Sequence, residues 1–349
     1  MNYGREILRD VEGYVPGEQP ESARVVKLNT NENPYPPSPR VMQALADITA
    51  DQLRRYPDPV FRRFRDICAR RYGYDSADWI MIGNGMDELL ALALRTFVDP
   101  GDTVVATYPT YSLYEVLCQL HGCHLRYIDL DDQYQLTPEF FEAQGRLCFL
   151  TRPNAPTGVC VPREDVARFC NRFPGIVVID EAYVDFADDD CMDFPKRFEN
   201  VIVMRTFSKS FSLAGMRIGT AICPPGLLRE FLKTKDSYNM DAVSQAAGIA
   251  AMEDYAYMLG TAAKVRKTRD ALRESLLDLG FAVPESGSNF LLAHWHGTPD
   301  ARTIFERLRD QGIFVRYFNA RRLDHCLRIT VGTDEDCTTL INALVELIG

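Results

Sequence analysis

Residues 176–183, which read IVVIDEAY, decide the fold of this chain. Four consecutive apolar residues without polar relief are typical of a strand buried on both faces, as in parallel sheets covered by helices. An acid follows at the carboxyl end of this strand, the edge at which open α/β sheets bind ligands. Asp180 is therefore a candidate metal ligand, general base or partner of a cationic ring nitrogen.

Similar short apolar runs occur before and after this stretch, at 103–107, 125–128, 147–150 and 201–204. The stretches between them are long enough to cross over as helices. Residues 87–97, rich in leucine and alanine, read as a helix. This alternation predicts an α/β fold with a mostly parallel sheet covered on both faces.

The order of helices and strands changes after about residue 255. Apolar residues at helical spacing occur around Leu272, Ile304 and Leu340, and the strand candidates between them are 290–293, 313–318 and 327–331. This pattern predicts a smaller α+β domain. We expect an N-terminal arm and hinge over 1–38, which ends in a proline-rich loop, a large domain over 39–255 and a small domain over 256–349.

Composition excludes several classes of protein. The 349 residues contain 39 Lys+Arg and 49 Asp+Glu, a net charge of −10, so no basic field attracts nucleic acid or an anionic membrane. The longest apolar run, Leu89–Leu94, is too short to span a bilayer. The N-terminus lacks a secretion signal, so we expect a cytoplasmic protein. The ten cysteines form no CxxC pair and read as buried thiols.

Residues 83–88, which read GNGMDE, precede the helix at 87–97. Glycines at such a turn let backbone amides approach a phosphate at the positive end of a helix, although an ordinary strand-to-helix turn has the same composition. Glu88 replaces the third glycine of the dinucleotide motif, and Asp102 precedes its strand rather than following it. A nicotinamide-binding fold is therefore poorly supported.

Residues 206–217, which read TFSKSFSLAGMR, gather a lysine, several hydroxyls and an arginine after another apolar strand. A partly desolvated lysine can lose its proton and attack a carbonyl, whereas the loop taken alone is equally typical of a polar surface. Together the three segments supply an amine, an acid and an anion site. Pyridoxal phosphate requires all three.

The order of PNAPTG at 153–158, DEAY at 180–183 and Ser208-Lys209 with Arg217 resembles the fold-type I pyridoxal-phosphate aminotransferases. Within them, LNTNENPY at 28–35 and LRITVGT at 327–333 resemble the histidinol-phosphate aminotransferases, and the resemblance spans nearly the whole chain. It implies a mostly parallel seven-stranded sheet in the large domain.

The resemblance also implies roles around the cofactor. Lys209 would be the Schiff-base lysine and proton carrier, and Asp180 the pyridinium partner. Asn154 and Tyr183 would hydrogen-bond the phenolic oxygen, and Tyr111 would stack on the ring. The phosphate would be held by Gly85, Met86, Thr206, Ser208 and Arg217.

Further positions match residues at the substrate mouth and the subunit boundary. Tyr56 matches a tyrosine that reaches the phosphate of the neighbouring subunit, which implies a homodimer. Arg316 and Arg328 match the substrate-anion arginines, a task that suits the planar guanidinium. Tyr14 and Asn29 are further candidates there.

The reaction that this resemblance implies converts L-histidinol phosphate and 2-oxoglutarate into imidazole acetol phosphate and L-glutamate, in histidine biosynthesis. An aromatic amino-acid aminotransferase or a threonine-phosphate decarboxylase on the same scaffold is the nearest alternative. An NAD-dependent dehydrogenase and a non-catalytic regulator are more distant ones. The motif PNNPTG here reads PNAPTG, with Ala155, and follows Arg152, an extra cation expected near the pocket that would alter the accepted anion.

No metal site is predicted. Cys118, His121, Cys123 and His124 match no standard zinc spacing. His294 and His296 alternate along a strand and are expected to face solvent or a packed surface. The basic run over 264–269 is expected to be the solvated face of its helix.

Overall fold

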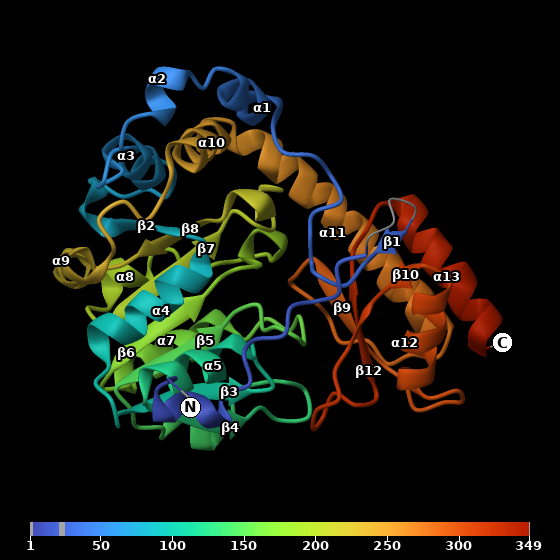
Figure 1. Cartoon of the computed structure of the whole chain (residues 1–349). Helices are drawn as coiled ribbons and strands as arrows, with labels where there is room; N and C mark the ends of the chain where they lie inside the picture. Colours follow the sequence, from blue (N-terminus) through green and yellow to red (C-terminus); the bar gives the residue numbers. More distant parts are fainter. Residues whose placement is uncertain (1–2, 21–24, 349) are drawn as a thin grey trace.

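A seven-stranded sheet forms the centre of the larger part of the molecule (Figure 1). This computed structural model describes residues 3–20 and 25–348. The strand order is β2-β8-β7-β6-β5-β3-β4, and every neighbouring pair is parallel except the two that β8 makes. The strands are β2 (Ile80–Asn84), β3 (Thr103–Tyr108), β4 (His124–Asp129), β5 (Leu147–Thr151), β6 (Ile176–Asp180), β7 (Val201–Thr206) and β8 (Ile218–Ile222). The predicted α/β fold is confirmed.

The two faces of this sheet bury two separate apolar cores. Along β6, Val177 and Ile179 belong to one core and Val178 to the other, as the two-residue period of a strand requires. The helices of this part are α1 (Pro39–Ala46), α2 (Ala50–Leu53), α3 (Arg62–Arg71), α4 (Met86–Phe97), α5 (Leu113–His121), α6 (Pro138–Phe141), α7 (Arg163–Arg172), α8 (Phe194–Arg197), α9 (Pro225–Thr234) and α10 (Ala242–Glu253). Burial on both faces explains the unbroken apolar runs.

The strand β8 was not predicted from the sequence. Its residues, IGTAI, interrupt the apolar run with glycine and threonine, although all five are buried. A Cβ on Gly219 would lie 2.7 Å from the backbone carbon of Gly85 and the nitrogen of Met86. Glycine is required here because the turn before α4 lies directly on the strand.

The smaller part is built on a three-stranded sheet of order β11-β12-β9 and a two-stranded one, β1-β10. Residues 313–318 were predicted as one strand but form two, β10 (Ile313–Phe314) and β11 (Arg316–Tyr317). They belong to different sheets because β10 pairs with β1 (Val26–Lys27), whereas β11 pairs with β12 (Cys326–Thr330). The remaining elements are β9 (Phe290–His294), α11 (Tyr255–Asp278), α12 (Ala301–Asp310) and α13 (Asp334–Ile348).

The long helix α11 runs from the larger part into the smaller one (Figure 1). Its Met258 and Val265 pack in the core of the larger part, and Leu272 packs in that of the smaller. Arg266 and Arg269 were expected to be solvated but are partly buried: they donate to the carbonyls of residues 186, 187 and 288. The domain limits 1–38, 39–255 and 256–349 stay a prediction.

All ten cysteines are free thiols and nine are buried, as predicted. Within residues 3–20 and 25–348, no helix combines the length and apolarity needed to cross a bilayer. The cytoplasmic location stays a prediction.

Candidate active site

A cavity of about 480 Å³ lies at the carboxyl ends of the central strands and reaches β11 and β12 of the smaller part. Its wall contains most of the site residues predicted from the sequence: Tyr14, Asn29, Met86, Tyr111, Asp180, Tyr183, Thr206, Ser208, Lys209, Arg217, Arg316 and Arg328. A larger cavity of about 890 Å³ contains neither the lysine nor Asp180. The smaller cavity is therefore the candidate active site.

Asp180 ends β6 and is almost fully buried. Its carboxylate accepts a hydrogen bond of 2.5 Å from Tyr114 Oη and one of 3.0 Å from the Ala182 N–H, both neutral donors. Burial raises the pKa of Asp180 to about 6, although these hydrogen bonds favour the charged form. A buried carboxylate in this condition is stabilised by a cation in the cavity, and a protonated ring nitrogen fits that requirement.

Lys209 lies in the loop after β7, and its Nζ donates to the carbonyl of Thr30 at 3.1 Å. Burial lowers the pKa of Lys209 to about 8, and the positive charge of Arg328 adds to this effect. The amine therefore loses its proton more readily than an exposed lysine, as a nucleophile toward an aldehyde requires.

The turn before α4 offers an anion site. Gly85, with φ +79°, precedes the helix without a side-chain cap, so no side chain satisfies the first N–H groups of α4. Arg217 reaches over this turn: its Nη1 lies 3.4 Å from Ser208 Oγ, and a Cβ on Gly85 would lie 2.7 Å from its Nη2. Thr206 Oγ1 donates to Ser208 Oγ at 3.0 Å. The amides, hydroxyls and guanidinium converge as a phosphate group requires.

Tyr183 and Asn154, both predicted to hydrogen-bond the cofactor ring, differ in whether they line the cavity. Tyr183 lines the cavity, and its Oη accepts a hydrogen bond of 3.0 Å from Asn31 Nδ2. Asn154 is buried beside the cavity, where its side chain bonds the carbonyl of Pro109 and the hydroxyl of Thr157. The structure does not bring Asn154 into the cavity wall.

Arg316 and Arg328 face each other across the β11–β12 pair. Arg328 donates to the Asn29 carbonyl at 2.8 Å, but its buried Nε has no hydrogen-bond partner. Arg316 makes long contacts, of 3.3 and 3.4 Å, with the carbonyls of Val15 and Pro16. Within residues 3–20 and 25–348 both guanidinium groups hydrogen-bond neutral carbonyls and neither pairs with a carboxylate, so an anion would complete the site.

Tyr14 and Asn29 line the cavity, and their contact with the substrate stays a prediction. The Tyr14 ring meets the Tyr111 ring edge-on, with centroids 5.7 Å apart. Asn29 is buried, and its Oδ1 has no hydrogen-bond partner among the described residues, so this oxygen can accept a hydrogen bond from a bound molecule. Tyr56 lies outside the cavity wall. It is 80% exposed and stacks on Tyr238 with centroids 4.4 Å apart.

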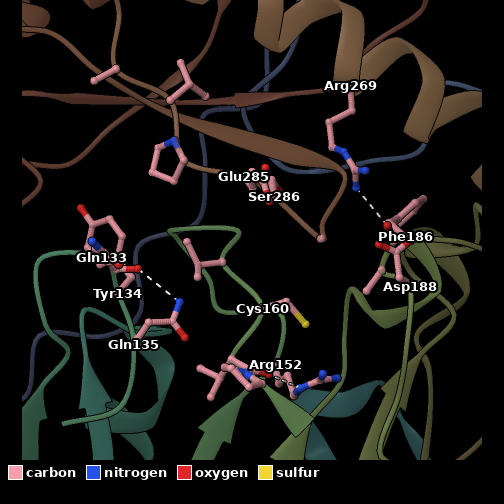
Figure 2. A pocket seen from close by; sticks show the side chains of 18 of the residues that line it. Gln133, Tyr134, Gln135, Arg152, Cys160, Phe186, Asp188, Arg269, Glu285 and Ser286 are labelled. Carbon is pink, nitrogen blue, oxygen red and sulfur yellow. Dashed lines mark hydrogen bonds between the residues drawn. The ribbon is translucent and has the colours of Figure 1, made fainter.

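Arg152 does not face the candidate active site, so the expected effect of this cation on the accepted anion is wrong. Its side chain points to the 890 Å³ cavity, where it bonds the Val161 carbonyl at 2.8 Å and the Asp189 carboxylate (Figure 2). The strand alternation that turns Thr151 into the active site turns Arg152 away from it.

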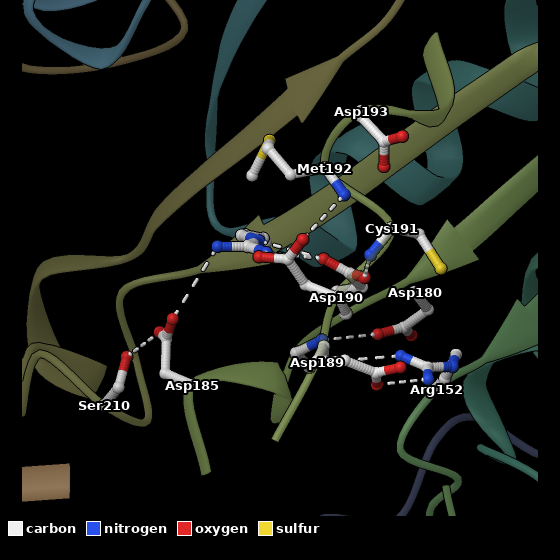
Figure 3. A network of polar contacts seen from close by, with 12 residues as sticks. Arg152, Asp180, Asp185, Asp189, Asp190, Cys191, Met192, Asp193 and Ser210 are labelled. Carbon is white, nitrogen blue, oxygen red and sulfur yellow. Dashed lines mark hydrogen bonds and ion pairs between the residues drawn. The ribbon is translucent and has the colours of Figure 1, made fainter. Parts of the chain in front are cut away.

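Several supporting residues were missed by sequence reasoning. Glu181 turns away from the cavity and bonds Arg205 at 2.8 Å, in a buried network that also contains Asp185 and Asp190 (Figure 3). Asp185 accepts a hydrogen bond from Ser210, the residue after the lysine. Because side chains alternate between the two faces of a strand, the sequence could have shown that Glu181 points away from the site that Asp180 faces. Tyr114 lies in none of the motifs quoted from the sequence. Asp87, whose carboxylate pairs with Arg217 Nη2 at 2.9 Å, lies in GNGMDE, and Asn31 lies in LNTNENPY, but neither was singled out.

Comparison with known proteins agrees with this geometry. Residues 23–344 match the model of the aminotransferase class I and II family. Histidinol-phosphate aminotransferase 1 of Trichormus variabilis is 42% identical over 349 residues, 99% of each chain. The histidinol-phosphate aminotransferase of Synechocystis sp. is 44% identical over 347 residues, 99% of this chain and 98% of that one.

Among solved structures, the histidinol-phosphate aminotransferase of Sinorhizobium meliloti in complex with pyridoxal 5′-phosphate has a TM-score of 0.85 and 31% identity, with 92% of this chain and 90% of that chain covered. An aspartate aminotransferase of Thermus thermophilus with maleate has a TM-score of 0.80 and 19% identity, with 93% and 91% covered. The second likeness shows the fold alone.

Proposed function

Because this chain belongs to the aminotransferase class I and II family and, within it, to the histidinol-phosphate aminotransferases, we propose that it transfers the amino group of L-histidinol phosphate to 2-oxoglutarate. The products are imidazole acetol phosphate and L-glutamate, and the reaction belongs to histidine biosynthesis. One observation carries this proposal: one cavity is lined by a lysine of lowered pKa, a buried carboxylate and two arginines, and among the described residues neither the carboxylate nor the arginines have an ion-pair partner.

We propose that the cavity binds pyridoxal phosphate. This group supplies an aldehyde that takes up the amino group and a ring that withdraws electrons when the substrate loses a proton. Asp180 would hold the proton of the ring nitrogen, and Tyr183 Oη would bond the phenolic oxygen. The N–H groups at Met86, the hydroxyl of Ser208 and the guanidinium of Arg217 would hold the phosphate. Asn154 and Thr206 remain proposed contacts, and Tyr111 would lie against the ring.

Lys209 would move the proton. Its Nζ lies in the cavity and, within the part of the chain that the structure describes, its one hydrogen bond is to a backbone carbonyl, which leaves the amine free to exchange protons. As a neutral amine, Lys209 would accept a proton from the substrate carbon and later donate it again. The lowered pKa of Lys209, about 8, keeps a working fraction of this base neutral near pH 7.

The two arginines would select anionic substrates. L-Histidinol phosphate and 2-oxoglutarate both carry an anionic group at one end, and Arg328 with Arg316 can bind either in turn. Asn29 and Tyr14 border the same mouth and would contact the rest of the substrate.

The test is product analysis with purified protein, L-histidinol phosphate and 2-oxoglutarate. Glutamate formed in equal amount to imidazole acetol phosphate supports the proposal. Carbon dioxide released from threonine phosphate without glutamate would instead identify a decarboxylase, and faster turnover of aromatic amino acids would identify an aromatic aminotransferase.

Replacing Arg328 with alanine is expected to raise KM for both substrates by about ten- to a hundredfold, because charge-assisted hydrogen bonds to the anion are lost. Cofactor affinity should change little, since Arg328 lies on β12 of the smaller part, whereas Arg217 lies beside Gly85 in the larger part. Steady-state kinetics and cofactor titration measure the two effects. Arg302→Ala, on the exposed face of α12, is the control. Equal losses of cofactor and substrate binding would contradict this role.

We propose a homodimer in which Tyr56 reaches the phosphate site of the neighbouring subunit. The support is its position: it is exposed and lies outside the cavity of its own chain. Mixing inactive Tyr56→Ala and Lys209→Ala subunits should then restore about a quarter of wild-type activity, because half of the dimers regain one intact site. If Tyr56 serves its own chain, no mixture will exceed the activity of the two variants alone.

A further inference from the structure

Three potential metal ligands meet outside the candidate active site, where β9 ends and β12 begins. Among the described residues, His294, His325 and Cys326 are the only group of three or more such side chains close enough to share an ion, with ligand atoms all within 4.8 Å of one another. Cys326 lies directly opposite His294 in the antiparallel β9–β12 pair, and His325 immediately precedes it. Strand register, not proximity in the sequence, brings the three together.

The spacing of the ligand atoms suits a tetrahedral ion. His294 Nδ1 lies 3.3 Å from His325 Nε2 and 3.4 Å from Cys326 Sγ. Zinc bonds of about 2.0–2.1 Å to nitrogen and about 2.3 Å to sulfur place tetrahedral neighbours about 3.4 Å apart for two nitrogens and about 3.6 Å apart for nitrogen and sulfur. Small side-chain shifts would complete the arrangement.

The outer nitrogen of each imidazole already has an oxygen partner. His294 Nε2 lies 3.4 Å from Tyr134 Oη, and His325 Nδ1 lies 3.2 Å from a carboxylate oxygen of Asp324. Metal-binding histidines commonly donate their second N–H to such oxygens, which fixes the ring and directs the other nitrogen at the metal. The ring of His296 stacks on that of His325 with centroids 4.5 Å apart and holds it further.

The number of protons available to the two histidines and the cysteine also favours a bound cation between them. A neutral imidazole carries one N–H. If the two rings donate to Tyr134 and Asp324, their inner nitrogens face each other at 3.3 Å as two lone pairs, with only the thiol proton of Cys326 to share. An ion that accepts electron pairs from both nitrogens and from the thiolate removes this conflict, and the thiol proton leaves to solvent.

One of the three ligands, His294, lines the cavity of about 890 Å³, to which both parts of the molecule contribute residues. His294 and His296 belong to its wall, together with Tyr134 and Gln133, which Figure 2 shows on one side. A fourth ligand position can therefore be taken by water. None of the three ligands belongs to the wall of the candidate active site.

We propose that His294, His325 and Cys326 bind a zinc-class transition-metal ion that ties the β9–β12 edge together beside the Tyr134 loop. Imidazole and thiolate together suit Zn²⁺ and its spectroscopic substitute Co²⁺ better than Mg²⁺ or Ca²⁺, which prefer oxygen. The proposal does not depend on the proposed reaction, because the ion touches no residue of that cavity.

The experiment uses the holoenzyme without a histidine tag, treated with chelator, dialysed and titrated with Co²⁺. We expect one equivalent to produce a thiolate-to-cobalt charge-transfer band and tetrahedral d–d bands in the red, both abolished by Zn²⁺. Cys326→Ser should lose the charge-transfer band. Asp324→Asn, an exposed change that leaves all three ligands, should raise the Kd for Co²⁺ about ten- to a hundredfold.

Cys160→Ser and His124→Asn are matched controls, since Cys160 lines the same cavity and His124 lies on β4, outside the cluster. Both should titrate like the wild type. A wild-type protein without the charge-transfer band at one equivalent, a band that persists in Cys326→Ser, or a band lost in Cys160→Ser would overturn the proposal.

Discussion

Replacing Lys209 with alanine is expected to lower kcat at least about a thousandfold, because the side chain is both the covalent anchor of the cofactor and the base that moves the proton. The fold should survive, since Nζ makes one hydrogen bond, to the Thr30 carbonyl. Pyridoxal phosphate should still bind through Arg217 and Asp180 but without a covalent bond. Kinetics, circular dichroism and borohydride reduction followed by mass spectrometry measure these effects.

Lys267→Ala is the control, because Lys267 is exposed on α11. It should keep wild-type kcat and the reduced cofactor adduct. If Lys209→Ala still yields a cofactor-bearing peptide after reduction, another lysine forms the bond and the assignment fails.

Replacing Asp180 with asparagine is expected to lower kcat at least about a hundredfold, because the ring nitrogen loses the fixed negative charge that holds its proton. Local structure should persist. Asparagine can accept from the Ala182 N–H and donate to the Tyr114 hydroxyl, which in turn can donate to Thr151 Oγ1, 2.8 Å away. Kinetics and the ultraviolet-visible spectrum of the bound cofactor give the readout.

The same change should stabilise the cofactor-free protein at pH 7. The pKa of Asp180 is raised to about 6 in the folded state, above its unfolded value, so ionised Asp180 costs stability above pH 6 and nothing below about pH 4. Asparagine removes a cost on the order of 3 kcal/mol. Denaturant unfolding of the cofactor-free protein should show the advantage at pH 7 and not at pH 4. An equal gain in the free energy of unfolding at pH 7 and pH 4 would contradict the claim that ionised Asp180 is uncompensated in the cofactor-free protein.

Much of the fold could be predicted because the central strands are buried on both faces. Such strands need continuous apolar runs, and all five predicted runs from 103 to 204 became strands, although β4, at the edge of the sheet, is buried only at Ile128. The strand prediction failed where a residue was selected by close backbone contact or by pairing with a second sheet instead of by burial alone. In β8, Gly219 makes room for the turn at Gly85, and in 313–318 one apolar run serves two sheets.

The chemistry of the candidate site was also predictable in part. Asp180 ends β6 and Lys209 follows β7, so their convergence follows from the parallel strands, whereas Arg217 joins them because the loop after β7 leads into the antiparallel β8. The prediction that Arg152 lies near the pocket was wrong, because closeness in sequence to a motif does not tell which way a side chain points.

By itself, the sequence determined which residue types stand at the ends of buried strands, since burial and cofactor chemistry each require particular side chains locally. Only the tertiary structure decided which distant residues meet. Arg316 lies opposite Arg328, Tyr114 bonds Asp180, and His294 meets Cys326 because of strand register and packing. Register depends on the whole core, and no local pattern encodes it.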